Sequence, residues 1–141
     1  MKLRFVEVDK FNKIHIDLLY EILKKRQHNI SHIELPDFNT HKLFVENINY
    51  RKWNLIYNKD QLIGNYYINY ENFIGINLLV NNIYYYQIII KEILSIENPL
   101  PEIKSIRNKY FLINSSPQNK FLNDALKLLN FRQIQSTYLC K

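Results

Sequence analysis

The sequence predicts one α/β (α+β) domain, residues 1–141, with a mixed, mainly antiparallel central sheet and about four flanking helices. Two observations support this prediction. Apolar residues alternate in some segments and recur at helical spacing in others. In addition, 141 residues with 47% hydrophobic content are enough for one core, and only two Gly and four Pro interrupt the pattern.

The first two thirds of the chain read as strand, helix, helix and three strands. Residues 3–8 alternate between apolar and polar, whereas apolar residues over 11–23 fall on one helical face. A short helix is expected to begin near Thr40, with Asn39 or Thr40 as its N-cap. The three strands are expected at 53–57, 62–70 and 73–80. Short polar turns join them, which predicts an antiparallel meander.

The last third reads as helix, strand, helix and strand. Apolar stripes predict a helix over 86–96, and the apolar run 110–114 predicts a strand. Ser116 is expected to cap the next helix, with Pro117 at its first position. The final strand is expected at 133–139.

Composition limits the classes of function. The N-terminal strand carries charges, no apolar run approaches membrane-spanning length, and Cys140 is the single cysteine. We therefore expect a cytoplasmic protein with no membrane partner. The net charge is +6, but the basic residues are dispersed, so no specific nucleic acid is expected as a partner. The tightest basic cluster, Lys24 to Arg26, is interpreted as a solvated helix end.

The most informative segment for function is the strand that ends at Asn114 and leads through a polar turn, containing Asn119, into an amphipathic helix. A helix N-terminus presents unpaired N–H groups, which makes such a turn a common place to hold a cofactor. The alternative is that Asn114 ends the strand and Asn119 satisfies the first turn of the helix.

These residues resemble the GNAT superfamily of acyl-CoA N-acyltransferases, in which the helix after the Asn turn ends in a Leu-Gly-Phe element. Leu129, Asn130 and Phe131 stand at that element here, and Asn is the best substitute for Gly in a left-handed position. Further matches resemble a branch of amino-sugar N-acetyltransferases found beside surface-polysaccharide genes. These matches are Ile30, Ser31, His32, Pro36, His41, Phe44, Val45, Tyr50, Lys52 and Trp53.

The resemblance implies that the strand at 73–80 lies parallel to the strand at 110–114 and diverges from it. Acetyl-CoA would enter the gap, and backbone groups near Leu78, Leu79 and Val80 would hold its pantetheine arm. The resemblance also implies that Asn114 and Asn119 contact the cofactor.

Two departures from the family pattern predict impaired CoA binding. The pyrophosphate loop of the family is rich in glycine, whereas this chain has Tyr84, Tyr85 and Tyr86 there. In a relic of such an enzyme, one of these rings would fill the cofactor slot; otherwise they pack in the core or line the site. The second departure is Leu126, which stands where many family members have a tyrosine acid.

His32 and His41 are the candidate catalytic bases, because imidazole titrates near neutral pH. Each could instead bond to nearby backbone. Tyr50 and Trp53 are the candidate walls of an acceptor site, and a core role is the alternative for Trp53. No metal is expected, because His28, His32 and His41 lack a fourth ligand.

The sequence therefore predicts a GNAT-like N-acetyltransferase that transfers acetyl from acetyl-CoA to a primary amine, such as an amino sugar. It leaves open whether the chain is an enzyme at all. The first alternative is a non-catalytic binding or assembly subunit with a protein partner. The second is a basic nucleic-acid-binding module, for which no recognised RNA-binding motif is present.

Overall fold

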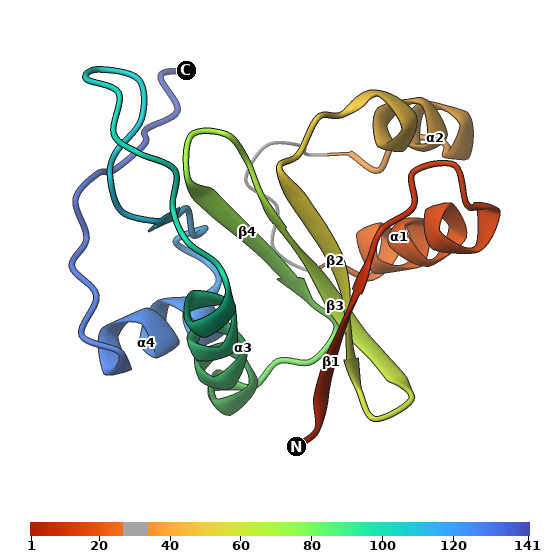
Figure 1. The fold of residues 1–141 in the computed structure, drawn as a ribbon, viewed down its shortest axis with the longest axis horizontal. Helices are drawn as coiled ribbons and strands as arrows, with labels where there is room; N and C mark the ends of the chain where they lie inside the picture. Colours follow the sequence, from red (N-terminus) through yellow and green to blue (C-terminus); the bar gives the residue numbers. More distant parts are fainter. Residues whose placement is uncertain (27–33) are drawn as a thin grey trace.

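The computed structural model describes residues 1–26 and 34–141. Its centre is a five-stranded sheet in the order β1-β2-β3-β4-β5 (Figure 1). The first four strands are antiparallel to their neighbours, and β5 is parallel to β4. The strands are β1 (Leu3–Glu7), β2 (Lys52–Asn58), β3 (Gln61–Ile68), β4 (Phe73–Leu78) and β5 (Leu112–Ile113). The predicted fold class is confirmed.

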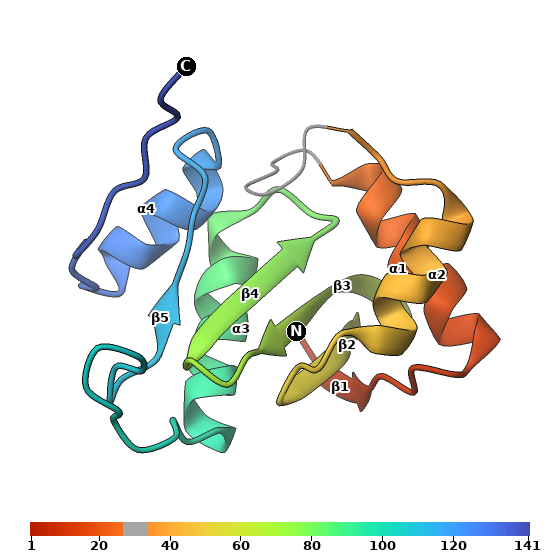
Figure 2. The same ribbon diagram turned by 90° about the horizontal axis from the view of Figure 1, so that it is seen from above.

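Within the described residues, four helices cover the two faces of the sheet. Figures 1 and 2 show α1 and α2 on one face and α3 on the other, with α4 beside α3 and β5. The helices are α1 (Lys13–Lys25), α2 (Phe38–Asn47), α3 (Ile83–Ile96) and α4 (Lys120–Leu128). Among the described residues, no helix is long and apolar enough to cross a membrane.

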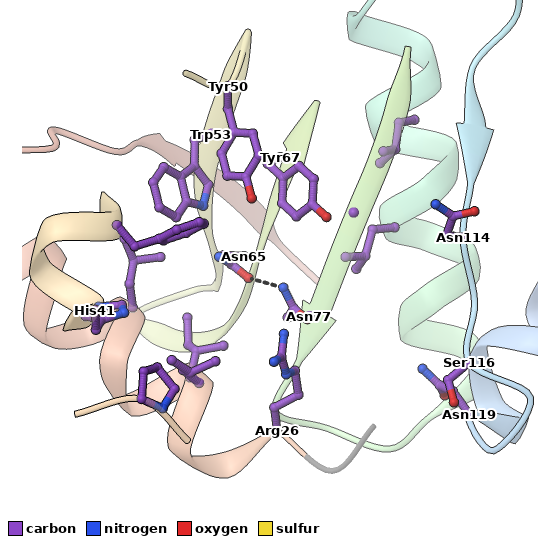
Figure 3. A pocket seen from close by; sticks show the side chains of 18 of the residues that line it. Arg26, His41, Tyr50, Trp53, Asn65, Tyr67, Asn77, Asn114, Ser116 and Asn119 are labelled. Carbon is purple, nitrogen blue, oxygen red and sulfur yellow. Dashed lines mark hydrogen bonds between the residues drawn. The ribbon is translucent and has the colours of Figure 1, made fainter. Parts of the chain in front are cut away.

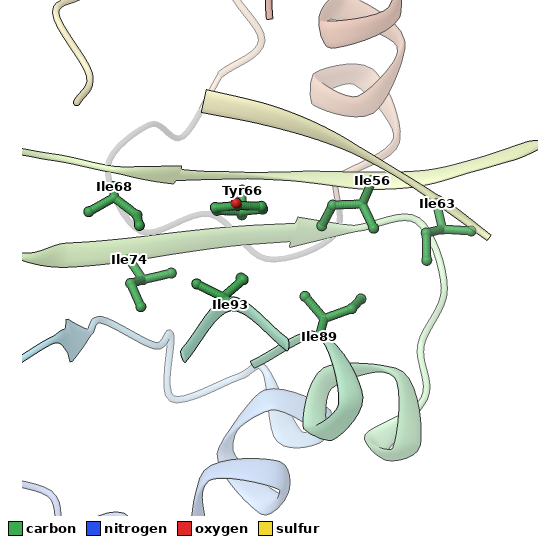
Figure 4. Close-up of a cluster of buried hydrophobic side chains, with 7 residues drawn as sticks. All are labelled: Ile56, Ile63, Tyr66, Ile68, Ile74, Ile89 and Ile93. Carbon is green, nitrogen blue, oxygen red and sulfur yellow. The ribbon is translucent and has the colours of Figure 1, made fainter. Parts of the chain in front are cut away.

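Each face of the sheet has its own core. Ile89 and Ile93 of α3 pack against a cluster of strand isoleucines and Tyr66 (Figure 4). On the opposite face, α1 and α2 pack against Trp53 and Leu55 of β2. This division follows from the strand period of two, which sends successive side chains to opposite faces.

A β-bulge near the start of β3 shifts the alternation of its side chains, so that Ile63 and Tyr66, three positions apart, both pack in the α3 core. Ile56 is opposite Gly64, but Tyr57 is opposite Leu62, so Ile63 is the extra residue. Leu62 packs in the α1/α2 core, and Ile63 packs in the α3 core. At Gly64 a Cβ would overlap the carbonyl oxygen of Asn77, so β3 and β4 can approach only because this residue is glycine.

Helix caps differ from the sequence prediction at three starts. Asp37, and neither Asn39 nor Thr40, caps α2, because its Oδ1 accepts from the Thr40 N–H at 2.8 Å. Asn82 caps α3, which therefore begins before residue 86. Asn119 caps α4, because the Ser116 hydroxyl instead accepts from the Gln118 N–H within the preceding turn.

The end of α4 matches the prediction for Asn130. This residue has a φ of 61°, in the left-handed region. The N–H of Asn130 bonds to the Lys127 carbonyl, and the N–H of Phe131 bonds to the Leu126 carbonyl. These two bonds form a Schellman motif, which asparagine supports here in place of glycine.

The predicted strand at 133–139 is wrong. Those residues have no regular structure and are exposed. The Gln133 side chain bonds locally to the Gln135 carbonyl and the Ser136 hydroxyl. β5 has only two residues, against the five predicted over 110–114, so it offers little edge for another strand to pair with.

The parallel neighbours β4 and β5 meet at one end only. Phe73 pairs with Leu112 and Ile74 pairs with Ile113, and the pairing then stops. Beyond this point the two segments diverge (Figure 2). The predicted parallel, diverging pair is confirmed.

Asn72 anchors this junction. It is fully buried, with a φ of 67°. Its Nδ2 donates to the carbonyls of Leu100 and Asn108, its Oδ1 accepts from the Leu100 N–H, and its carbonyl accepts from the Leu112 N–H. One residue thus holds both the loop before β5 and the start of β5 against the β3–β4 turn.

We predict that Asn72→Gly lowers the free energy of unfolding by about 3 kcal/mol, because three bonds at a buried site are lost. Glycine keeps the left-handed backbone, so the effect isolates the side chain. Urea denaturation measures it. The matched control is Lys59→Gly, which also has a positive φ, of 55°, but in the β2–β3 turn. An equal effect in the two variants would contradict the anchoring role.

Candidate functional site

A cavity of about 510 Å³ lies on the α1/α2 face of the sheet and continues into the gap between β4 and β5. Its lining comes from α1, α2, the strands β2 to β4, and the turn between β5 and α4. Figure 3 shows the two ends: Tyr50, Trp53 and Tyr67 on one side of β4, and Asn114, Ser116 and Asn119 on the other. The cavity thus joins an aromatic side to an amide-rich turn.

The edge of β4 presents backbone groups to this gap. The Phe73 carbonyl accepts from the Asn69 N–H and the Leu79 N–H donates to the Ile63 carbonyl, so both residues turn toward the β3 side. By the alternation of a strand, Ile74, Ile76 and Leu78 turn toward the β5 side. Of these three residues, only Ile74 is paired with β5. Ile76 and Leu78 therefore offer backbone groups that no other strand of the described residues uses, as needed to bind an extended amide-containing chain.

The aromatic wall is a set of rings that fix one another. Tyr50 and Tyr67 stack with ring centroids 4.1 Å apart and planes 9° apart, and Trp53 meets Tyr50 edge-on at 5.0 Å. Tyr67 lies over Gly75, where any Cβ would overlap its ring. Burial raises the pKa of Tyr50, so its hydroxyl stays protonated. The wall is rigid and neutral.

Two asparagines add amide groups to the cavity lining. Asn65 is buried on β3, and its Oδ1 accepts from Asn77 Nδ2 at 3.1 Å. The bond fixes both amide planes. Neither residue was predicted as a site residue from the sequence. The signal that could have found them is a polar residue at an inward-facing position of a largely apolar strand.

At the turn after β5, Asn114 and Asn119 both line the cavity together with Ser116. Asn114 is exposed, whereas Asn119 is buried. Asn119 also has the structural role given as its alternative, because its Oδ1 accepts from the Leu122 N–H and its Nδ2 donates to the Tyr86 hydroxyl. The predicted cofactor turn therefore lines the cavity, but the side-chain amide of Asn119 is already hydrogen-bonded within the protein.

The three tyrosines of the altered loop do not line the cavity. Tyr84 is exposed, Tyr85 packs at the edge of the α3 core, and Tyr86 is buried between α3 and α4. The loop still differs from a phosphate-binding loop, because Asn82 Oδ1 accepts from the Tyr84 N–H at 2.8 Å. One of the first amides of α3 is thereby occupied.

Leu78, Leu79 and Val80 also lie outside the cavity lining. The side chain of Leu78 packs against the α3 core, and that of Leu79 packs against the α1/α2 core. The backbone of Leu78 is not paired with β5, whereas the Leu79 N–H is bonded to the Ile63 carbonyl. Leu126 packs against the α3–α4 cluster and supplies no hydroxyl.

Of the two candidate bases, His32 lies outside the described residues, as does His28. His41 is buried and lines the cavity. Its Nε2 lies 3.1 Å from the Ile16 carbonyl oxygen, which can only accept, so Nε2 carries the proton. This bond ties α2 to α1 and leaves Nδ1 as the basic atom. In the described ranges, no group of three His, Cys, Asp or Glu side chains is placed to hold a metal ion.

Arg26 corrects the interpretation of the basic cluster. Lys24 is exposed and pairs with Glu21, and Lys25 is exposed, as expected of a solvated helix end. Arg26, however, lines the cavity and is partly buried. It follows the last residue of α1, where the chain leaves the helix with extended backbone. The sequence pattern alone could not show that this third cation turns inward.

We predict that the His41 imidazole makes stability depend on pH. Burial is the main cause that lowers its pKa, against the Ile16 carbonyl and Asp17, which raise it. The unfolded chain then binds this proton more readily, so stability is lost as the pH falls below an ordinary histidine pKa of about 6.5. Urea denaturation from pH 7.5 down to 5.5, roughly one unit either side of that value, should show a shallower slope for His41→Gln than for the wild type. Identical slopes would contradict a neutral, buried His41.

Comparison with known proteins supports the fold. No protein-family model matches the sequence, and no curated protein matches it. The structure is similar to the crystal structure of a possible acetyltransferase from Clostridium difficile 630, with a TM-score of 0.56. The alignment covers 100% of this chain and 98% of that chain, at 12% sequence identity. The chain therefore shares the α+β fold of that protein.

Proposed function

We propose that this protein is an N-acetyltransferase that takes acetyl-CoA into the gap between β4 and β5 and acetylates a primary amine, such as an amino sugar. The observation that carries the proposal is the continuous cavity, which passes the unpaired edge of β4 and joins the aromatic wall to the Asn114 turn. The similarity to a possible acetyltransferase supports it at the level of the fold.

The pantetheine arm suits the β4 edge. It contains two amides in an extended chain. Ile76 and Leu78 offer backbone N–H and C=O groups that can form hydrogen bonds with those amides. An N–H from this edge would also stabilise the oxyanion that forms when the amine attacks the thioester. In the overall reaction a C–N bond forms, the C–S bond breaks, the amine loses a proton and the thiolate gains one.

The nucleotide end of acetyl-CoA should contribute less binding free energy than a glycine-rich loop would allow. Asn82 already occupies the Tyr84 N–H, and bulky side chains surround the start of α3. We therefore propose that binding depends mainly on the pantetheine arm. This reconciles an altered loop with a cavity that Tyr84, Tyr85 and Tyr86 leave open.

A calorimetric titration tests the function. We expect saturable binding of acetyl-CoA, and S-acetylpantetheine, which lacks the nucleotide, should bind within about tenfold of it. Asn114→Phe should abolish both, because a ring at this cavity-lining position blocks the gap. Tyr138→Ala is the control and should leave both affinities unchanged, because that side chain is exposed and lies outside the cavity lining.

Two outcomes would contradict the proposal. Absence of any acetyl-CoA binding would leave the non-catalytic binding subunit as the better interpretation. Binding that survives Asn114→Phe would place the ligand elsewhere.

A further inference from the structure

Arg26 is a cation in the cavity without a counterion. Within residues 1–26 and 34–141, the ion pairs are Lys13–Asp17 and Lys24–Glu21, so Arg26 has none. Figure 3 shows its guanidinium directed into the cavity, toward Asn77. Burial lowers the pKa of Arg26, with Tyr67 and Tyr50 acting in the opposite direction. A partly desolvated cation is costly unless an anion pairs with it.

Glu34 does not supply that anion. It lines the cavity as well, but it is exposed and lies beyond ion-pair distance of Arg26. Asn65 and Asn77, which also line the cavity, are neutral and are bonded to each other. The cavity thus holds one partly buried positive charge, Arg26, that no carboxylate of the described residues neutralises.

Trp53 provides a second, independent observation. Its side chain lines the cavity, the residue is 9% exposed, and Nε1 is buried with no hydrogen-bond partner in the described part of the chain. In Figure 3 the indole nitrogen lies on the edge of the ring toward Asn65 and Tyr67. A buried N–H without an acceptor costs free energy, so an oxygen of a ligand is expected to meet it.

We propose that the amine acceptor is an acidic amino sugar, with a carboxylate or phosphate that pairs with Arg26 and a ring oxygen or hydroxyl that accepts from Trp53 Nε1. Tyr50 and Tyr67, which are stacked on each other, line the cavity with their ring edges and hydroxyl groups and give a sugar ring apolar and polar contacts between Arg26 and Trp53. This proposal rests on the proposed function for the acetyl transfer, whereas acceptor binding itself can be measured without acetyl-CoA.

Calorimetry with three amines tests the proposal: glucosamine, glucosamine 6-phosphate and 2-amino-2-deoxyglucuronic acid. Against the wild type, at least one of the two anionic sugars should bind about tenfold or more tightly than glucosamine, and the better one identifies phosphate or carboxylate as the preferred group. Arg26→Gln should remove this advantage. Arg26→Lys should keep part of it, because the charge remains but the planar fork is lost.

Two further variants separate the contacts. Arg132→Gln is the matched control, because Arg132 is exposed and carries the same charge; it should leave the anionic advantage intact. Trp53→Phe keeps an aromatic ring but removes the N–H. It should weaken all three sugars by the same factor, since the oxygen at the indole is common to them.

The proposal is overturned if glucosamine binds as tightly as both anionic sugars, if Arg26→Gln behaves like Arg132→Gln, or if none of the three binds. If one of these results is obtained while acetyl-CoA binds as expected, the acceptor proposal fails and the proposed function stands. If acetyl-CoA does not bind but an anionic sugar binds through Arg26, the acceptor site stands and the acetyl transfer does not.

Discussion

The site depends on two strands that pair at one end and separate at the other. If β5 continued along β4, the backbone of Ile76 and Leu78 would be used within the sheet, and no gap would exist. The pairing instead ends after Ile74 and Ile113. Asn72 holds the paired end in place, because its side chain and carbonyl bond to both the loop before β5 and the start of β5. Asn72 thus fixes the position of the end from which the gap opens.

The cavity beyond this gap combines a rigid aromatic wall with two polar groups that lack partners, a guanidinium without a counterion and an indole N–H without an acceptor. Stacked and edge-on rings fix Tyr50, Trp53 and Tyr67 relative to one another, so the wall costs little further ordering when a ligand binds. Among the described residues, Arg26 has no ion-pair partner, and the indole Nε1 of Trp53 is one of two buried side-chain nitrogens without a hydrogen-bond partner, the other being Nη1 of Arg51. Groups of this kind are common where a ligand completes the structure.

Periodicity predicted the order of nearly all elements, because each helix and strand buries a regular apolar face. It failed at 133–139, where the residues form no strand and the preceding strand, β5, has only two residues to pair with. Helix starts were misplaced for a related reason. Asn39, Thr40, Asp37 and Ser116 are all competent caps, and the choice among them depends on the turn that precedes each helix.

The candidate site was predicted in part. His41, Tyr50, Trp53, Asn114 and Asn119 do meet at one cavity. The tyrosines of the altered loop do not join them, because helical spacing turns Tyr84, Tyr85 and Tyr86 toward solvent and two separate cores. Arg26 was missed because a cation at a helix end has an ordinary explanation, and only the tertiary structure shows that it points inward.

Amide hydrogen exchange followed by NMR tests the central claim most directly. In the free protein, the N–H groups of Ile76 and Leu78 should exchange faster than those of Gly75 and Asn77, which face β3. Saturating acetyl-CoA should slow exchange at Ile76 and Leu78 and leave the other two unchanged. Exchange at Ile76 and Leu78 that is already slow without ligand, or that acetyl-CoA does not alter, would contradict the account.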